Sequence, residues 1–357
     1  MPEEAAIEAR VRDAFRDQAK ACNNLGSPFT ARLCRLVADR LLASSPVGNR
    51  ILRWPGNPTS SGDSVALRLA GALHALVLSG RDDGLKASYP PNRVDDEILW
   101  QAVGRALRQE ADLILDRLAS APQTNEVRRS GALLPGFLTV AQLFGKPLVL
   151  SEVGASAGLN LHWDRYHYVL GNDHWGDETA AVLIAPDWSG ETPPLQPIEI
   201  VERAGCDLHP LDPASDDDRL RLLSYIWADQ FDRLDRTRKA LDIAAGQGDL
   251  VERADAIDWL KKRLIRVFFG ATHVVYHSVA WQYLPESAKG EGEALIAAAG
   301  AAATEEAPLA RLQMETDGQA PGAALSLQIW PGGERQVIGR ADFHGRWIAW
   351  EGWRINA

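Results

Sequence analysis

Apolar positions repeat at helical spacing through the first part of the chain. One stripe begins after Ser27-Pro28, a favourable N-cap followed by a proline in the first turn, and it holds Phe29, Leu33, Leu36, Val37 and Leu41. Similar stripes follow Ser64 and Asp95-Asp96. Because no convincing strand pattern precedes Pro147, we predict a helical region over residues 1–140.

After Pro147 the pattern changes to short apolar runs separated by helical stripes. The predicted strands are 148–153, 198–208, 250–253, 273–277, 309–315, 326–330 and 347–350. The predicted helices are 217–244, 256–267 and 292–303. This alternation predicts an α/β domain over residues 141–357 with a mostly parallel, seven-stranded, Rossmann-like sheet and a C-terminal antiparallel hairpin. Residues 162–197, rich in turns, are expected to be an insertion.

Composition narrows the functional classes. The chain of 357 residues is 46% hydrophobic and has a formal charge of -10, which argues against nonspecific binding to nucleic acid. Its most apolar stretch, 65–79, is too short for a membrane span. The cysteines, Cys22, Cys34 and Cys206, fit no zinc module, and no metal site is expected. With no signal peptide in residues 1–20, we expect a cytoplasmic protein.

The most informative segment is the end of the first predicted strand. Glu152 closes an apolar run and is followed by Gly154, Ser156 and Gly158, so the strand enters a turn of small residues that opens a helix. Such a turn lets a nucleotide-like ligand approach the backbone closely. A carboxylate disfavours a phosphate there but suits a cationic or hydroxyl-rich ligand. The spacing also lacks the dinucleotide-binding fingerprint.

Further polar residues follow the other strands. Asp207 ends the second strand, Asp255 with Ala256 follows the third, and His277-Ser278 ends the fourth. Because ligands of open parallel sheets bind at the carboxyl ends of the strands, we expect these side chains to line one site. Each also has a structural interpretation, in which Asp207 caps a turn, Asp255 caps a helix and His277 is a buried, hydrogen-bonded histidine. Residues 125–129 are either a clamp over the site or a surface loop.

In this arrangement the chain resembles the class I S-adenosylmethionine-dependent methyltransferases over residues 147–352. The resemblance implies that the turn holds the methionine part of the cofactor, through Glu152, Gly154, Ala155, Ser156 and Gly158. It further implies that Asp207 binds the ribose, that Asp255 and Ala256 meet the adenine, and that His277 and Ser278 face the methyl donor. Ser156 departs from the family's usual glycine.

More narrowly, the sequence is similar to the DUF2332 family of bacterial proteins of unknown function. The similar stretches are 26–28, 123–126, 152–160, 163–166, 205–212 and 277–278. This resemblance implies a methyltransferase-like fold but no substrate.

Two hypotheses follow from these patterns. The first is a methyltransferase that uses S-adenosylmethionine to modify a small-molecule or peptidic acceptor, with His277 as a base or orienting group and Ser278 beside it. The alternative is a non-catalytic module that binds a nucleoside-like ligand or serves in assembly. A nicotinamide-dependent oxidoreductase is a weaker third option. The sequence leaves the acceptor and the oligomeric state open.

Overall fold

The computed structural model describes residues 2–354, which fold as two compact units. The first unit comprises the described residues up to Thr124 together with Ser215–Asp235. The second comprises Asn125–Ala214 and the described residues from Arg236 onward. Ser215–Asp235 therefore belongs to the first unit, although it lies between strands of the second unit in the sequence.

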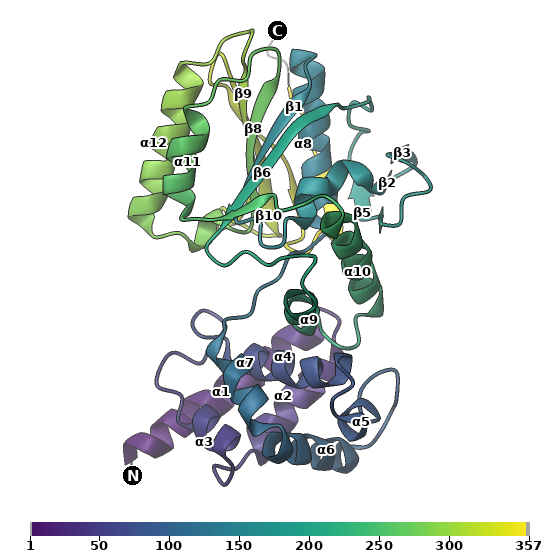
Figure 1. Ribbon diagram of the computed structural model, residues 1–357, viewed down its shortest axis with the longest axis vertical. Helices are drawn as coiled ribbons and strands as arrows, with labels where there is room; N and C mark the ends of the chain where they lie inside the picture. The colour runs from purple at the N-terminus through teal and green to yellow at the C-terminus, as the bar shows by residue number, and fades with distance from the viewer. Residues whose placement is uncertain (1, 355–357) are drawn as a thin grey trace. The chain divides into compact units, whose positions relative to one another are not determined.

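The first unit is helical (Figure 1). Its helices are α1 (Pro2–Asn24), α2 (Pro28–Arg40), α3 (Pro46–Leu52), α4 (Val65–Leu78), α5 (Asp83–Lys86), α6 (Asp96–Gln109), α7 (Ala111–Ala119), α9 (Asp216–Ser224) and the start of α10 (Phe231–Ala245). The predicted start of α2 is confirmed, because the Ser27 side chain accepts a hydrogen bond from the Thr30 amide. No strand lies between residues 2 and 147, as predicted.

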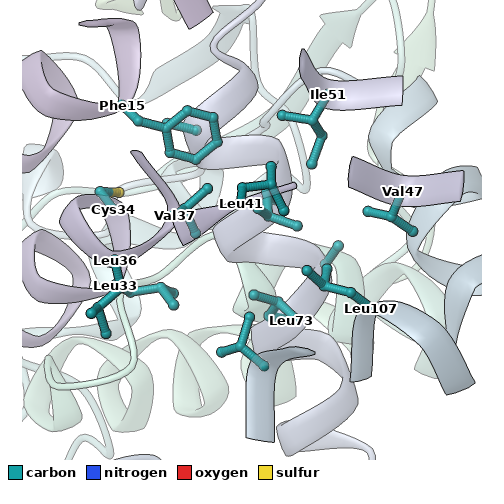
Figure 2. Close-up of a cluster of buried hydrophobic side chains, with 14 of the residues drawn as sticks. Phe15, Leu33, Cys34, Leu36, Val37, Leu41, Val47, Ile51, Leu73 and Leu107 are labelled. Atoms are coloured by element: carbon teal, nitrogen blue, oxygen red, sulfur yellow. The ribbon is translucent and has the colours of Figure 1, made fainter. Parts of the chain in front are cut away.

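One apolar core holds these helices together. Figure 2 shows side chains of this core, among them Phe15, Val37, Ile51, Leu73 and Leu107, which belong to α1, α2, α3, α4 and α6. All five are almost completely buried. The stripe predicted in α2 supplies Val37 to this core, so the helical periodicity of the sequence does mark the buried face.

The single helix predicted over residues 217–244 is wrong. The chain forms α9 and α10, separated by Tyr225–Gln230. In this break the Asp229 carboxylate accepts hydrogen bonds from the Ser27 hydroxyl and, at 2.9 Å, from the Phe29 amide. A carboxylate about 200 residues away in sequence thus caps α2, and this long-range contact competes with helix continuation.

The second unit is built on a nine-stranded sheet in the order β5-β12-β11-β10-β9-β8-β1-β6-β7. Its strands are β1 (Leu148–Val153), β5 (Asp187–Ser189), β6 (Ile200–Asp207), β7 (Val251–Arg253), β8 (Thr272–Ser278), β9 (Leu309–Glu315), β10 (Ala323–Trp330), β11 (Arg335–Ala341) and β12 (Trp347–Trp350). The neighbours from β7 to β9 pair in parallel, whereas β9, β10, β11 and β12 pair antiparallel. The predicted α/β class and the antiparallel C-terminal end are confirmed.

The predicted number of seven strands is wrong, and both extra strands are short or partly exposed. The strand-like residues expected between Gly333 and Trp350 form β11 as well as β12. Strand β5 comes from the predicted insertion and pairs in parallel with β12 at the edge of the sheet. Such strands carry little apolar signal, because only part of each faces the core.

The insertion forms a small sheet of its own. Its strands are β2 (His167–Leu170), β3 (Asp173–Trp175) and β4 (Leu183–Ile184), in the order β3-β2-β4. The helix predicted after Gly158 is a short 3-10 helix, Leu159–Arg165. Its carbonyls accept from tyrosines that follow it: Tyr166 donates to Leu159 at 2.6 Å and Tyr168 donates to Trp163 at 2.8 Å. These side-chain bonds replace those that a longer helix would make.

Helices cover both faces of the nine-stranded sheet, as the alternating pattern predicted (Figure 1). Helix α8 (Arg129–Phe144) packs on one face, and α11 (Ala256–Leu264) and α12 (Glu286–Ala301) lie side by side on the other. Strand β1 is buried along its whole length. Of the helices in residues 2–354, none combines the length and the apolar character that a membrane span needs.

The packing of α12 against the sheet can be tested at two of its glycines. A Cβ at Gly300 would lie 2.4 Å from the Trp330 ring, whereas a Cβ at Gly290 would meet nothing within 4 Å. We expect Gly300→Ala to lower the free energy of unfolding by about 1–3 kcal/mol through overpacking. The control Gly290→Ala should raise it by about 0.5–1 kcal/mol. Urea unfolding measures both changes, and equal stabilisation by the two variants would contradict the packing.

Candidate functional site

The order of the parallel strands reverses at β1. From β1 the chain continues to β6 and β7 on one side, and it later returns to place β8 and β9 on the other. Ligands of open α/β sheets bind outside the carboxyl ends of the strands at such a reversal. The register aligns Glu152 of β1 with Gly205 of β6 and Tyr276 of β8, so the residues after these positions meet at one edge.

The turn after β1 has an unusual backbone. Gly154, Ser156 and Gly158 have φ angles of 73°, 56° and 71°, so all three are left-handed. Ser156 therefore adopts the conformation for which glycine is normally used, at a modest energetic cost. A Cβ at Gly154 would lie 2.6 Å from the Cβ of Ala280, in the loop after β8. The turn thus closes tightly against the neighbouring strand end while the Gly154 backbone stays exposed.

Most backbone amides of this turn already have partners. Gly154 and Ala155 donate to the Cys206 carbonyl at 2.9 and 3.0 Å, and Ser156 donates to Asp207 Oδ2 at 2.9 Å. A phosphate-binding loop instead directs several amides toward its anion. The geometry therefore argues against a phosphate at this turn, in agreement with the carboxylate that precedes it.

Glu152 is a buried acid with a strongly raised pKa. Its side chain is 2% exposed, and its Oε2 atom lies 3.3 Å from the hydroxyl of Tyr276. Burial raises the pKa of Glu152 to about 8, although the hydrogen bond from Tyr276 and the charge of Arg129 oppose this shift. Near neutral pH the group is therefore mostly protonated, and strongly shifted pKa values of this kind cluster at functional sites.

Residues 125–129 contact the strand ends through hydrogen bonds. Asn125 Oδ1 accepts from the Leu159 amide at 3.0 Å, and Asn160 Nδ2 donates to the Glu126 carbonyl at 3.2 Å. Arg129, at the start of α8, donates from Nη1 to the Ser278 carbonyl at 3.1 Å. The segment is therefore bonded to its neighbours and does not form an exposed surface loop, whereas its role as a clamp over a ligand stays a prediction.

The loop after β8 is held by one carboxylate. Glu315, at the end of β9, accepts from the amides of Ala280, Trp281 and Gln282 at 2.9, 3.0 and 3.3 Å. Val279, which precedes them, has a φ of 52°, a rare conformation for a β-branched residue. The strained residues Ser156 and Val279 thus lie in the two loops that flank the reversal of strand order. Strain of this kind persists only where the surroundings fix it, and it is concentrated at functional sites.

His277 lies beneath this loop and is completely buried. Its Nδ1 atom is 2.7 Å from Glu315 Oε1, its Nε2 atom is 3.3 Å from Arg311 Nη2, and its ring stacks on Trp281 at 4.8 Å. Burial lowers the pKa of His277, although Glu315 opposes the shift. The partners fit a neutral imidazole that donates from Nδ1 and accepts at Nε2. The ring therefore links the loop to β9.

Two carboxylates that were predicted to bind a ligand, those of Asp207 and Asp255, accept hydrogen bonds from the protein backbone. Asp207 accepts from the His209 amide at 2.9 Å as well as from Ser156, and so joins two loops. Asp255 caps α11, where it accepts from the amides of Ile257 and Asp258. Ala256 is the first residue of this helix. It stays a prediction that Asp207, Asp255 and Ala256 contact a ligand. The same holds for Ser278, which is 7% exposed.

A small hollow of about 10 Å³, about the size of one water molecule, borders the turn at Ala157 and Gly158. His162 and Val251 also line it. Burial lowers the pKa of His162 to about 4, so this ring is neutral. Within residues 2–354 no group of three or more His, Cys, Asp or Glu side chains is arranged to hold a metal ion.

Comparison with known proteins gives one match. A family described as "Uncharacterized protein conserved in bacteria (DUF2332)" matches residues 12–350. No protein with a curated description and no solved structure matches the chain. The matched range covers nearly all of both units.

The raised pKa of Glu152 predicts a pH-dependent stability. Between its ordinary pKa of 4.5 and about 8, the unfolded chain is ionised while the folded chain keeps its proton. Stability should therefore fall as the pH rises through this window, by an amount on the order of several kcal/mol. Glu152→Gln should remove this slope, whereas the exposed Glu252→Gln should keep it. Thermal unfolding across the window measures the difference, and parallel curves for the native chain and Glu152→Gln would refute the burial argument.

The role of Glu315 predicts a second effect on stability. Glu315→Gln removes a charge that three amides and His277 share, so we expect it to cost about 1.5–3 kcal/mol. The control is Glu293→Gln, because Glu293 is 57% exposed and lies 3.7 Å from Arg311. Its cost should be at most about 1 kcal/mol. Chemical unfolding compares them, and similar losses would show that Glu315 does not hold the loop.

Proposed function

The chain belongs to the DUF2332 family, and from the strand ends of its second unit we propose that it is an S-adenosylmethionine-dependent methyltransferase. One observation carries the proposal. The left-handed turn Gly154–Gly158, preceded by the buried acid Glu152, lies where the order of the parallel strands reverses. The acceptor is a small molecule or a peptide.

The fit of the cofactor rests on charge and space at this turn. S-adenosylmethionine carries an ammonium, a sulfonium and a carboxylate. A bound cation would lower the raised pKa of Glu152 and so favour its carboxylate, which then suits the cationic groups. Arg129, whose charge acts on Glu152, suits the carboxylate of the cofactor. The exposed backbone at Gly154 leaves room for close approach. Because most amides of the turn are used internally, a cofactor without a phosphate fits better than a dinucleotide.

Methyl transfer needs little general acid or base catalysis. Its rate depends mainly on aligning the acceptor, the methyl carbon and the sulfur. The cofactor supplies the electrophilic methyl group, and this chain supplies the alignment. We assign His277 to this task as a positioning residue, because its buried ring acts on the loop after β8 through Glu315. The loop in turn lies against Gly154.

A specific observation favours one alternative, a non-catalytic module that binds a nucleoside-like ligand. Asp207 accepts hydrogen bonds from two loops, and Asp255 caps a helix. His277 is completely buried. Such a module would bind the cofactor without transferring its methyl group. Incubation with labelled S-adenosylmethionine and a panel of amine, thiol, hydroxyl and carboxylate acceptors separates the two functions.

Calorimetric titration with S-adenosylmethionine and S-adenosylhomocysteine tests the shared claim of cofactor binding. We expect saturable binding of both at neutral pH. Glu152→Gln should weaken binding about tenfold or more, because a charge-assisted contact is lost. The matched control is Glu252→Gln, because Glu252 is an exposed acid of β7, which β6 separates from β1; this variant should bind normally. No heat from the native chain at millimolar ligand would sink the proposal.

A further inference from the structure

Three arginines lie close together on the helical unit without a carboxylate to pair with. Arg68 of α4, Arg117 of α7 and Arg221 of α9 belong to helices that pack together, because α4 contacts both α7 and α9 (Figure 1). None of the three forms an ion pair among the described residues. Elsewhere on the same unit arginines do pair with acids, as Arg32 does with Asp96. The chain as a whole has a formal charge of -10, so this arginine cluster is a local exception.

Tyr225 shows how close the three guanidinium groups are. A Cβ at Gly71 would lie 2.6 Å from Tyr225 Cε1, so the ring rests on α4 one turn after Arg68. Arg221 precedes Tyr225 by one helical turn. Burial raises the pKa of Tyr225, and the charges of the three arginines oppose this shift. All three therefore act on one hydroxyl, which has no hydrogen-bond partner among residues 2–354.

Arg68 is the buried anchor of the cluster. It is 8% exposed, and it donates from Nε to the Asp63 carbonyl at 2.6 Å and from Nη1 to the Leu118 carbonyl at 2.9 Å. Leu118 follows Arg117, so the second bond joins α4 to the turn of α7 that carries Arg117. The carboxylate of Asp63 accepts instead from the Trp54 indole at 2.8 Å. The hydrogen-bond acceptors of Arg68 are thus neutral carbonyls, which hold the side chain in place.

Arg221 has a buried donor without an acceptor. Its Nε atom is buried, and no described residue accepts a hydrogen bond from it. The side chains of Arg221 and Arg117 are otherwise partly exposed, so an ion from solvent can reach them. A buried N–H without an acceptor opposes folding, and like charges held together repel each other. The fold itself gives no reason for this arrangement, whereas a bound anion would satisfy the donor and offset the repulsion.

We propose that the cluster of Arg68, Arg117 and Arg221 binds a phosphate group, with the Tyr225 hydroxyl as a further donor. Guanidinium groups suit phosphate because their planar N–H donors form paired bonds to its oxygens. Three positive charges also favour a dianion over a single carboxylate. The site lies on the partly exposed surface of the first unit and needs no enclosed cavity. It lies wholly within that unit, so it stands or falls separately from cofactor binding at the sheet.

Calorimetric titration of the full chain in a phosphate-free buffer of low ionic strength tests the proposal. The probes are inorganic phosphate, ribose 5-phosphate and ribose. We expect saturable binding of the two phosphates, no binding of ribose, and weaker binding as salt is added. Tighter binding of ribose 5-phosphate would identify a phosphate ester as the ligand, and equal binding would identify the free ion.

Matched variants locate the binding. Arg117→Gln and Arg221→Gln should each weaken phosphate binding about tenfold or more, because charge-assisted bonds are lost. The control Arg81→Gln removes the same charge from a side chain of the first unit that is 58% exposed and pairs with Glu110, so it should bind normally. Phosphate should raise the Tm of the native chain but not that of Arg221→Gln, and without ligand Arg221→Gln should not lower the Tm.

Three results would overturn the proposal. Neither phosphate binds at millimolar concentration. Arg81→Gln weakens binding as much as Arg221→Gln does, which would mean an adventitious ion only. Arg221→Gln lowers the Tm without ligand, which would mean that this arginine serves the fold.

Discussion

The second unit depends on one constraint, the burial of β1 between two parallel neighbours, β6 and β8, which both follow it in the sequence. Every residue of β1 is buried, and the strand is pinned to β8 at two levels. Ser151 Oγ lies 2.8 Å from His273 Nε2 and accepts from Arg263 of α11 at 2.8 Å. One residue further, Glu152 meets Tyr276. The contacts of Ser151 and the contact between Glu152 and Tyr276 thus hold β1 and β8 in one register. This register brings the loops after the two strands together.

The site is built from strained and fully bonded loops on this rigid base. Ser156 and Val279 occupy left-handed conformations, and carboxylates hold the loops that contain them. Such rigidity would suit the proposed methyl transfer, which depends on alignment, because the geometry is set before a ligand arrives. The same rigidity explains why acids that were expected to bind a ligand accept hydrogen bonds from the protein itself. The same carboxylate can hold a loop through one lone pair and face a ligand through another.

Much of the fold was readable from the sequence because its signals are local. The bounds of β1 were predicted to the residue, since a short apolar run leads into Glu152 and a turn that contains glycine. Helix α2 followed from Ser27 and Pro28 in the same way. The small strands of the insertion were missed, because two or three half-exposed residues leave no periodic pattern.

The parts of the site that were not predicted depend on contacts between distant residues. Glu315 binds amides about 35 residues away, and Asn125 binds Leu159 across a similar distance. Neither residue has a distinctive local motif. The break between α9 and α10 has the same origin, because Asp229 serves α2 rather than its own helix. Local patterns thus marked where the strands end, whereas the partners that fix those ends became visible only in three dimensions.

The most direct measurement is a crystal structure of the chain with S-adenosylhomocysteine. The account predicts ligand density along the carboxyl ends of β1 and β6, with the amino-acid end beside Gly154 and within reach of Glu152. An empty strand edge at saturating ligand, or density bound elsewhere on the molecule, would contradict it.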